Sequence, residues 1–379
     1  MDVAAANGPN GQIDIVSLRN RKHGTYTHKY TRRDAMLYAL GLGCSTTCPG
    51  DLRYVYEGAG ADSGGQQQPQ QSQQQLQQQQ QQQGPAGSGP QAGPPPPPPV
   101  GGQFAVLPTY TIVAAHSALA LVPLESYLPG GLDRAGALHG EQYLQLLAPL
   151  PAEGGQLVSR PELVDMQAKG KGLVVVLRTV TTDAVSGRDV AINEFTTFIL
   201  GKGDVRTPWP PAPRLPAAVA PNEPPPRAPD AVVELPTSRD QAALYRLSGD
   251  YNPLHIDPQV SARVGFPQPI LHGLCTMGIS VRLVLRRFGG YDPARLKSVK
   301  VRFAKPVLPG ETLRVEMWAE PAPASSSGSR AGPVKVVFRT WAVERQALAI
   351  ANAAVELHPE GAGAGAGAGL GVGSPPSRL

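Results

Sequence analysis

Residues 274–288 read LCTMGISVRLVLRRF, and apolar side chains occupy six of the nine positions from Met277 to Leu285. A helix on a protein surface carries its apolar residues along one face, whereas a helix that is apolar all round is buried. The run is shorter than the 18 or more apolar residues that a membrane span requires. We therefore expect a buried helix around which a domain is built.

Strand patterns occur twice in the chain in the same order. Val175–Thr179 is followed by Val190–Leu200 in the first half, and Val336–Thr340 is followed by Leu348–Leu357 in the second. Alternation of Val, Ile, Phe and Thr with other residues is typical of half-buried strands. Because order and spacing both repeat, we infer two copies of one α+β unit. The first copy shows no helix pattern as long as 274–288.

Low-complexity segments separate and interrupt the two units. The sequence predicts an N-terminal tail at 1–25, an N-terminal unit at 26–205 with a disordered Gln/Pro-rich insert at 64–102, a Pro-rich linker at 206–230, a C-terminal unit at 231–358 with a long hairpin loop at 325–332, and a flexible Gly/Ala tail at 359–379. Within the first unit, Thr31 and Asp34 form a capping-box pattern. This pattern predicts a short helix that Gly41 or Gly43 ends.

Composition and charge exclude several classes of protein. The net charge of +5 is modest and no basic block is interleaved with aromatic residues, so nucleic acid is not an expected partner. Cys44, Cys48 and Cys275 suit neither a disulfide framework nor a zinc site. We expect free thiols in a reducing compartment and no bound metal. The N-terminus also lacks the pattern of a secretory signal peptide.

The last three residues, Ser377-Arg378-Leu379, have the small–basic–leucine pattern of a peroxisomal address. They follow a Gly/Ala tail that would present them well to a receptor. We therefore expect a peroxisomal protein that binds an import receptor through this tripeptide. We expect no segment that spans a membrane.

The segment Ser248–His255, which reads SGDYNPLH, concentrates the residues that carry chemistry. A capping box at Ser238–Gln241 predicts a helix that runs to about Leu247, and Gly249 is placed to end it. Asp257-Pro258 has the pattern of an N-cap and first position of the next helix. The segment is therefore expected to be a rigid turn between capped helix ends, which is a suitable mount for catalytic groups.

An acid and a base lie on this turn. Asp250 and His255 can together hold and polarise one water molecule, and Asn252 can orient it. Such acid–base help accelerates a reaction by roughly two to four orders of magnitude. Gly273 opens the predicted buried helix, where unpaired backbone N–H groups and the helix dipole favour negative charge. Its amide is a candidate donor to an oxygen that gains negative charge during a reaction.

Gly249–His255 match the motif Gly-Asp-x-Asn-Pro-Leu-His at every position, and in this motif the chain resembles the MaoC-like type 2 enoyl-CoA hydratases. Three further segments look like the hydratase region of peroxisomal multifunctional enzyme type 2: Tyr30–Gly41, Leu138–Tyr143 and Val301–Val307. Apart from inserts and tails, the resemblance covers most of the chain. It implies a double hot-dog fold, in which each of two tandem units wraps an antiparallel sheet around a central helix. In that family the absence of a long helix from the first unit opens a cavity for a long acyl tail.

The same resemblance implies a hydro-lyase that adds water reversibly to trans-2-enoyl-CoA and gives (3R)-3-hydroxyacyl-CoA in peroxisomal fatty acid β-oxidation. It makes Asp250 and His255 the catalytic pair, with Asn252 in support, and it places Gly273 at the thioester oxygen. Four residues are implied to contact the acyl-CoA: His139, Gly140, Lys169 and Phe303. No cofactor is implied apart from the coenzyme A of the substrate, and a homodimer is suggested.

Alternatives remain open at this level. The chain could be a 3-hydroxyacyl-thioester dehydratase of fatty acid synthesis, or a non-catalytic hot-dog protein that binds acyl-CoA. Single residues have alternatives too: Lys171 in place of Lys169, a plain turn at His139-Gly140, a core role for Phe303 and a structural role for Glu141. The residues leave undecided the acyl chain length, the oligomeric state, the role of the insert and which member of the pair moves which proton.

Overall fold

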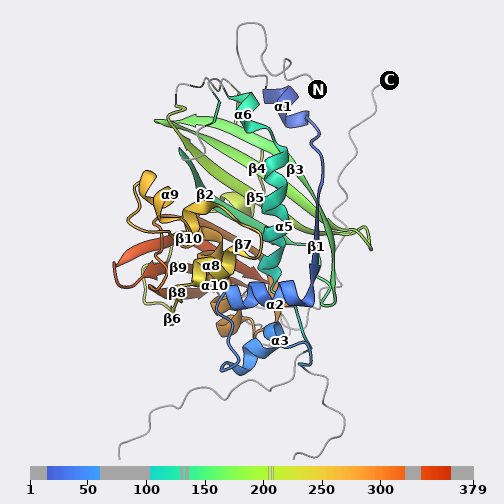
Figure 1. The fold of residues 1–379 in the computed structure, drawn as a ribbon, viewed down its shortest axis with the longest axis vertical. Coiled ribbons are helices and arrows are strands. Elements are labelled where there is room, and N and C mark those ends of the chain that lie inside the picture. The colour runs from blue at the N-terminus through green and yellow to red at the C-terminus, as the bar shows by residue number, and fades with distance from the viewer. Residues whose placement is uncertain are drawn as a thin grey trace, which may run out of the picture.

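The computed structural model describes residues 15–59, 103–128, 131–132, 136–203, 205, 207, 209–320 and 334–359 of the 379-residue chain. The predicted Gln/Pro-rich insert, the hairpin loop at 325–332 and the tripeptide Ser377–Leu379 lie outside the described residues. The described part is an α+β structure, in which one large twisted sheet carries helices against it (Figure 1).

Ten antiparallel strands form one continuous sheet in the order β1-β3-β4-β5-β2-β7-β10-β9-β8-β6. Their bounds are β1 Tyr26–Thr31, β2 Ala137–Leu146, β3 Gly154–Lys169, β4 Gly172–Asp183, β5 Asp189–Leu200, β6 Ala231–Pro236, β7 Leu296–Phe303, β8 Thr312–Glu320, β9 Lys335–Ala342 and β10 Ala347–Leu357. The second half of this order repeats the first half in reverse, because β6 to β10 take the places of β1 to β5. The two predicted copies therefore exist, and they join where β2 pairs with β7 from Glu141↔Arg302 to Gln145↔Ser298.

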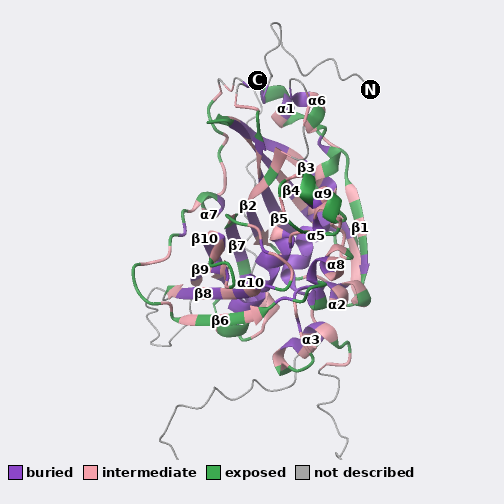
Figure 2. Cartoon of the chain, turned by 60° about the vertical axis from the view of Figure 1, so that its left-hand side comes forward, coloured by how far each residue is buried: buried purple, intermediate pink, exposed green. Residues whose placement is uncertain are grey.

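The long helix predicted from 274–288 is confirmed as α10, Gly273–Phe288. Every residue from Leu274 to Leu285 is buried, including Thr276, Ser280 and Arg282. The helix packs against β7, β8 and β10, so the C-terminal half of the sheet wraps around it. Figure 2 shows α10 as a buried element within the curve of these strands. This arrangement confirms the hot-dog layout of the second unit.

The first unit has only a short helix in the corresponding place. Helix α5, Thr111–Ala118, packs against β1, β3, β4 and β5 and has half the length of α10. The remaining α-helices of the described residues are also short: α1 Ile15–Asn20, α2 Arg32–Gly41, α3 Leu52–Val55, α6 Leu124–Tyr127, α7 Pro216–Val219, α8 Gln241–Arg246 and α9 Pro258–Arg263. None of these helices is long and apolar enough to cross a membrane.

Two local expectations can be compared with the structure. The capping box at Thr31 and Asp34 forms with both reciprocal hydrogen bonds, and Gly43 takes a positive φ of 74° just after α2. Part of the predicted N-terminal tail is instead the helix α1, which packs on β3. The sequence signal was weak because only Ile15 and Leu18, three residues apart, bury apolar surface there.

Helix α10 also fastens the two units together. The Arg282 guanidinium donates to Asp51 (2.8 Å) and to the carbonyls of Leu42 (3.1 Å) and Gly43 (3.0 Å). Asp51 and Arg282 are both almost fully buried. Gly278 lies so close to Leu42 that a Cβ atom would approach its methyl groups to 2.7 Å. The central helix of the second unit thus packs directly on the segment that follows α2 in the first.

Candidate active site

The motif turn begins where α8 ends. Gly249 has a φ of 137°, which a side chain would strain, and a Cβ there would also lie 3.1 Å from Val113 of α5. The capping box predicted before α8 forms only in part. Gln241 accepts from the Ser238 N–H (3.1 Å), but the helix starts at Gln241 with Asp240 as N-cap, so the Ser238 hydroxyl accepts from Asp240 instead. The helix therefore begins later than predicted and ends at Arg246.

His255 lies at the end of a short 3-10 helix, Pro253–His255, and is 9 % exposed. Its Nδ1 lies 2.8 Å from the carbonyl oxygen of Ile270. Because a carbonyl can only accept, Nδ1 carries the proton and Nε2 is left with a free lone pair. Burial lowers the pKa of His255 below its ordinary value, so the ring is neutral at pH 7. The turn thus presents a base whose tautomer is already set.

Asp250 is half-buried between three histidines. Burial alone would raise its pKa, but the ionised carboxylate interacts favourably with His116, His272 and His255 and with the N–H of Asn252, and these interactions hold the pKa below the ordinary value. The Asn252 N–H donates to Oδ1 of Asp250 (3.2 Å). Asp250 is therefore ionised at neutral pH, whereas burial keeps His255 and His272 neutral, and these are the protonation states needed for an acid–base pair.

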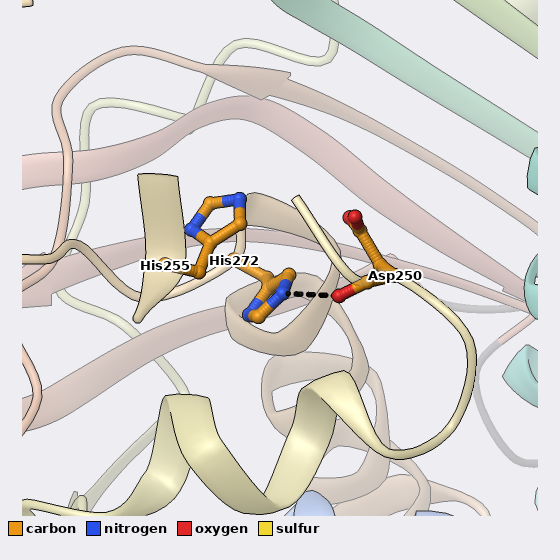
Figure 3. Close-up of side chains that lie close together, drawn as sticks. All are labelled: Asp250, His255 and His272. Atoms are coloured by element: carbon orange, nitrogen blue, oxygen red, sulfur yellow. Dashed lines mark hydrogen bonds between the residues drawn. The ribbon is translucent and has the colours of Figure 1, made fainter. Parts of the chain in front are cut away.

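His272 completes the cluster. Its Nε2 lies 3.1 Å from the backbone carbonyl of Asp250, and its ring stacks on that of His255 with centroids 3.7 Å apart (Figure 3). It is 1 % exposed, and burial together with the neighbouring His255 lowers its pKa strongly. Atoms of Asp250, His255 and His272 that can bind a ligand all lie within 4.8 Å of one another. The predicted pair is thus brought together, with a third polar group beside it.

Gly273 opens α10 next to this cluster. No side chain caps the first turn, so its N–H groups lack partners within the helix. A Cβ on Gly273 would lie 3.2 Å from the ring of Phe303, and that ring contacts the ring of His139 at 4.9 Å between centroids. Three residues that the sequence places in the substrate site are therefore neighbours.

A β-bulge aims His139 at this place. The pairing of β2 with β5 shifts between His139 and Glu141, so Gly140 is the extra residue. A plain turn at His139-Gly140 is therefore wrong, because both residues lie inside β2. Burial, together with the electrostatic influence of His116, lowers the pKa of His139 to about 4, so this imidazole is neutral at pH 7.

Other predicted residues have different surroundings. The side-chain oxygen of Asn252 accepts from the Leu254 N–H (3.0 Å) and caps the 3-10 helix, so its observed role is to shape the turn. Lys169 lies exposed at the end of β3, opposite Gly172, and its side chain forms no hydrogen bond or ion pair with the described residues. Glu141 pairs with Lys300 (3.5 Å), which agrees with a structural role. Orientation of water by Asn252 and phosphate binding by Lys169 remain predictions.

Two residues of the cluster were not singled out from the sequence. His272 stands beside Gly273 at the start of the predicted helix, and that neighbourhood was the available signal. His116 comes from α5 of the first unit and influences the pKa of Asp250, His255 and His139. Its spacing along the chain carried no signal, because only folding brings α5 to the motif.

A cavity of about 560 Å³ opens beside His255. It is lined by α8 and by the loops before α10 and β8, with Arg239, Ile256, Gln268 and Glu311 among its residues. Asp250 and Gly273 are not part of the lining, so His255 lies between the cavity and the buried cluster. The imidazole can therefore be reached from the surface.

The cluster is poorly arranged for a metal ion. A tetrahedral zinc site needs lone pairs that converge on a point about 2.0–2.2 Å from each ligand atom. The rings of His255 and His272 are stacked with an angle of 26° between their planes, so their in-plane lone pairs run side by side. The arrangement suits hydrogen bonding to a small molecule better than coordination.

The sheet and the acid–base turn define a MaoC-like protein of the double hot-dog class. Residues 221–336 match the MaoC-like domain, and residues 101–201 match the MFE-2 hydratase 2 N-terminal domain. A probable enoyl-CoA hydratase 2 of Dictyostelium discoideum is 36 % identical over 81 % of this chain and 87 % of its own length. The chain belongs to the MaoC-like enoyl-CoA hydratase 2 family.

Two further similarities agree with this membership. Peroxisomal multifunctional enzyme type 2 of Mus musculus is 37 % identical over 93 % of this chain, which spans 40 % of that longer protein. The crystal structure of a MaoC-like dehydratase from Phytophthora capsici superimposes with a TM-score of 0.65 at 31 % identity, covering 91 % of this chain and 99 % of that one.

Proposed function

We propose that the chain is a (3R)-specific enoyl-CoA hydratase that adds water reversibly to trans-2-enoyl-CoA. The observation that carries this proposal is the meeting of Asp250, His255 and the uncapped start of α10 in one cluster. A protein that only binds acyl-CoA has no need of such a pair. The names of the similar proteins, enoyl-CoA hydratase 2 and peroxisomal multifunctional enzyme type 2, support the same activity.

The chemistry follows from the protonation states. The oxygen of one water forms a bond to C3 of the substrate, one of its protons is taken up by the pair, and C2 receives a proton from the pair. His255 Nε2 is free to accept, because Nδ1 is engaged with Ile270. Negative charge that collects on the thioester oxygen would be met by the Gly273 N–H, and one such donor typically contributes about 3–4 kcal/mol to transition-state stability. No cofactor besides the coenzyme A of the substrate enters this scheme.

The test is direct. Purified protein is mixed with trans-2-enoyl-CoA of several chain lengths, loss of the enoyl thioester absorbance is followed, and the product is resolved by chiral chromatography. We expect (3R)-3-hydroxyacyl-CoA. Binding without turnover at every chain length, or a (3S) product, would refute the proposal.

A dehydratase of fatty acid synthesis is the second candidate, since a solved relative at 31 % identity is named a MaoC-like dehydratase. Both activities use the same reversible reaction and differ in the carrier of the acyl group. Comparing kcat/KM for the coenzyme A thioester with that for the acyl-carrier-protein thioester separates them. A preference for the carrier protein would favour the second candidate.

We also propose a place in peroxisomal β-oxidation, because a relative at 37 % identity is named peroxisomal. Recognition of Ser377-Arg378-Leu379 by an import receptor and assembly into a homodimer belong to this proposal. A fluorescent fusion that keeps the tripeptide exposed is expected in peroxisomes, and deletion of the tripeptide is expected to leave it in the cytosol. Light scattering of the purified chain measures the oligomeric state.

A further inference from the structure

We propose that His272 is a positioning residue that holds Asp250 and His255 at a fixed position relative to the start of α10. The inference rests on the proposed hydration reaction, in which water, pair and oxyanion donor must act on adjacent atoms of one substrate. His272 is the N-cap residue of α10 and is bonded covalently to Gly273. The position of His272 is therefore tied to that of the proposed oxyanion donor, the Gly273 N–H.

One contact of His272 reaches the acid. Its Nε2 lies 3.1 Å from the carbonyl oxygen of Asp250, and a carbonyl only accepts, so Nε2–H donates (Figure 3). This bond fixes the backbone of the residue whose carboxylate is needed. Gly249 just before it has no side chain to restrict its backbone, so the hydrogen bond to His272 helps to fix the direction of the chain at Asp250.

The second contact reaches the base. The ring of His272 lies face to face with that of His255 at 3.7 Å, and the ring of Tyr245 lies on the imidazole at 4.9 Å between centroids. His272 thus contacts two rings, and the face of its ring gives His255 a buried surface to pack on. A neutral His272 keeps this stack free of like charge, which agrees with its strongly lowered pKa.

Helix capping does not explain this side chain. Among the described residues, the His272 side chain accepts no hydrogen bond from the first N–H groups of α10, although the residue stands at the N-cap. Its one polar contact points away from the helix, toward the motif turn. A residue retained only to start the helix would be replaced without loss by serine or asparagine, which are better N-caps. The geometry therefore assigns the imidazole to the turn rather than to the helix.

The experiment compares three variants by their kcat and KM for an enoyl-CoA that wild-type protein hydrates. His272→Gln places an amide N–H near the position of Nε2 and keeps the donor to Asp250. His272→Asn places its amide near Nδ1 and cannot reach that carbonyl, and His272→Leu removes every donor. We expect the Gln variant to keep most of kcat, while Asn and Leu lose roughly tenfold to a hundredfold, the scale of a misplaced reacting group. KM should change little in all three.

The control and the possible failures are distinct. His28 donates or accepts in a comparable contact with the Tyr110 hydroxyl (2.9 Å), and His28→Leu is expected to lower stability without lowering kcat. If wild-type protein is inactive, the proposed function fails. If the wild-type protein is active and the Asn variant has the same kcat as the Gln variant, positioning by His272 is refuted. It is also refuted if the variants differ from wild type in KM and not in kcat. The inference also fails if Asn or all three variants do not fold, because His272 would then be a stability residue.

Discussion

The two hot-dog units share a strand order but differ in the segment that comes after the helix following their first strand. In the N-terminal unit α2 leads into residues 42–51, where Asp51 is buried in an ion pair with Arg282. In the C-terminal unit α8 leads into residues 247–257, where Asp250 faces histidines instead. The segment in the N-terminal unit thus binds helix α10 of the C-terminal unit. The corresponding segment in the C-terminal unit carries the residues proposed to do the chemistry.

The difference shows how a repeated scaffold can separate stability from reaction. An aspartate beside an arginine is neutralised permanently, because the guanidinium does not lose its proton. An aspartate beside neutral imidazoles keeps an ionised carboxylate with partners that can still take up a proton. The central helices of the two units also differ. Helix α10 runs through the core of the C-terminal unit, whereas the shorter α5 of the N-terminal unit brings His116 to the cluster.

The largest expected effect concerns the turn of the C-terminal unit. His255→Ala and Asp250→Asn should each reduce kcat by roughly two to four orders of magnitude, because a general acid–base group is removed. Circular dichroism should show an unchanged fold. The matched substitution in the other unit, Thr47→Ala on the exposed part of its loop, should leave kcat unchanged. Wild-type rates for both motif variants would contradict the assignment of the pair.

The next effect concerns the ion pair of the N-terminal unit. Arg282→Met leaves the buried Asp51 without its cation, and breaking such a pair costs about 3–5 kcal/mol. Urea unfolding measures the free energy of unfolding. Lys335→Met is the control, because its pair with Glu320 is solvent-exposed and contributes about 0–1 kcal/mol. Equal losses in the two variants would show that Asp51 is not buried as described.

A smaller effect is expected where α10 touches the N-terminal unit. In Gly278→Ala the added methyl group would approach Leu42 to 2.7 Å, and overpacking of this kind costs about 1–3 kcal/mol. Thermal unfolding by calorimetry measures the change. Ser117→Ala, on the half-exposed face of α5, should stay within about 0.5 kcal/mol. A stabilised Gly278→Ala protein would mean that the two segments are farther apart than the structure has them.

The smallest expected effect is a shift in the pH profile. Because the pKa values of Asp250 and His255 are both lowered, kcat/KM should stay constant on acidification and fall only below pH 6.5, the ordinary value for histidine. His116 contributes to lowering both pKa values, so His116→Gln should move this acid limb to higher pH. His23→Gln is the control and should not move it. An acid limb above pH 6.5 in wild-type protein would reverse the expected sign.

The same shifts predict the pH dependence of stability. A buried neutral His255 binds fewer protons than the unfolded chain, so the free energy of unfolding should fall as pH drops through 6.5. Asp250 acts in the same direction at lower pH, since its lowered pKa contributes stability above its ordinary value of 3.8 that is lost only in stronger acid. Urea unfolding at several pH values, compared between wild type and His255→Ala, isolates the first contribution.

Much of the site was readable from local pattern. The motif at 249–255, the apolar helix and the Asp257 cap depend on residues close in sequence, and the structure has each of them. Other parts depend on contacts between distant segments. The bulge at Gly140 exists only in the pairing of β2 with β5, and the approach of His116 requires α5 to pack beside Gly249.

The tripeptide Leu-His-Gly occurs twice, at 138–140 and at 271–273. Short-range physics favours a helix after the second, because an apolar run begins there, but it gives no comparable signal around the first. It could not assign their tasks, because the letters are identical. Folding placed His139 on a bulged strand against Phe303 and His272 on a helix start against His255. The tasks differ because burial, stacking and hydrogen-bond partners are set by residues far away in the chain.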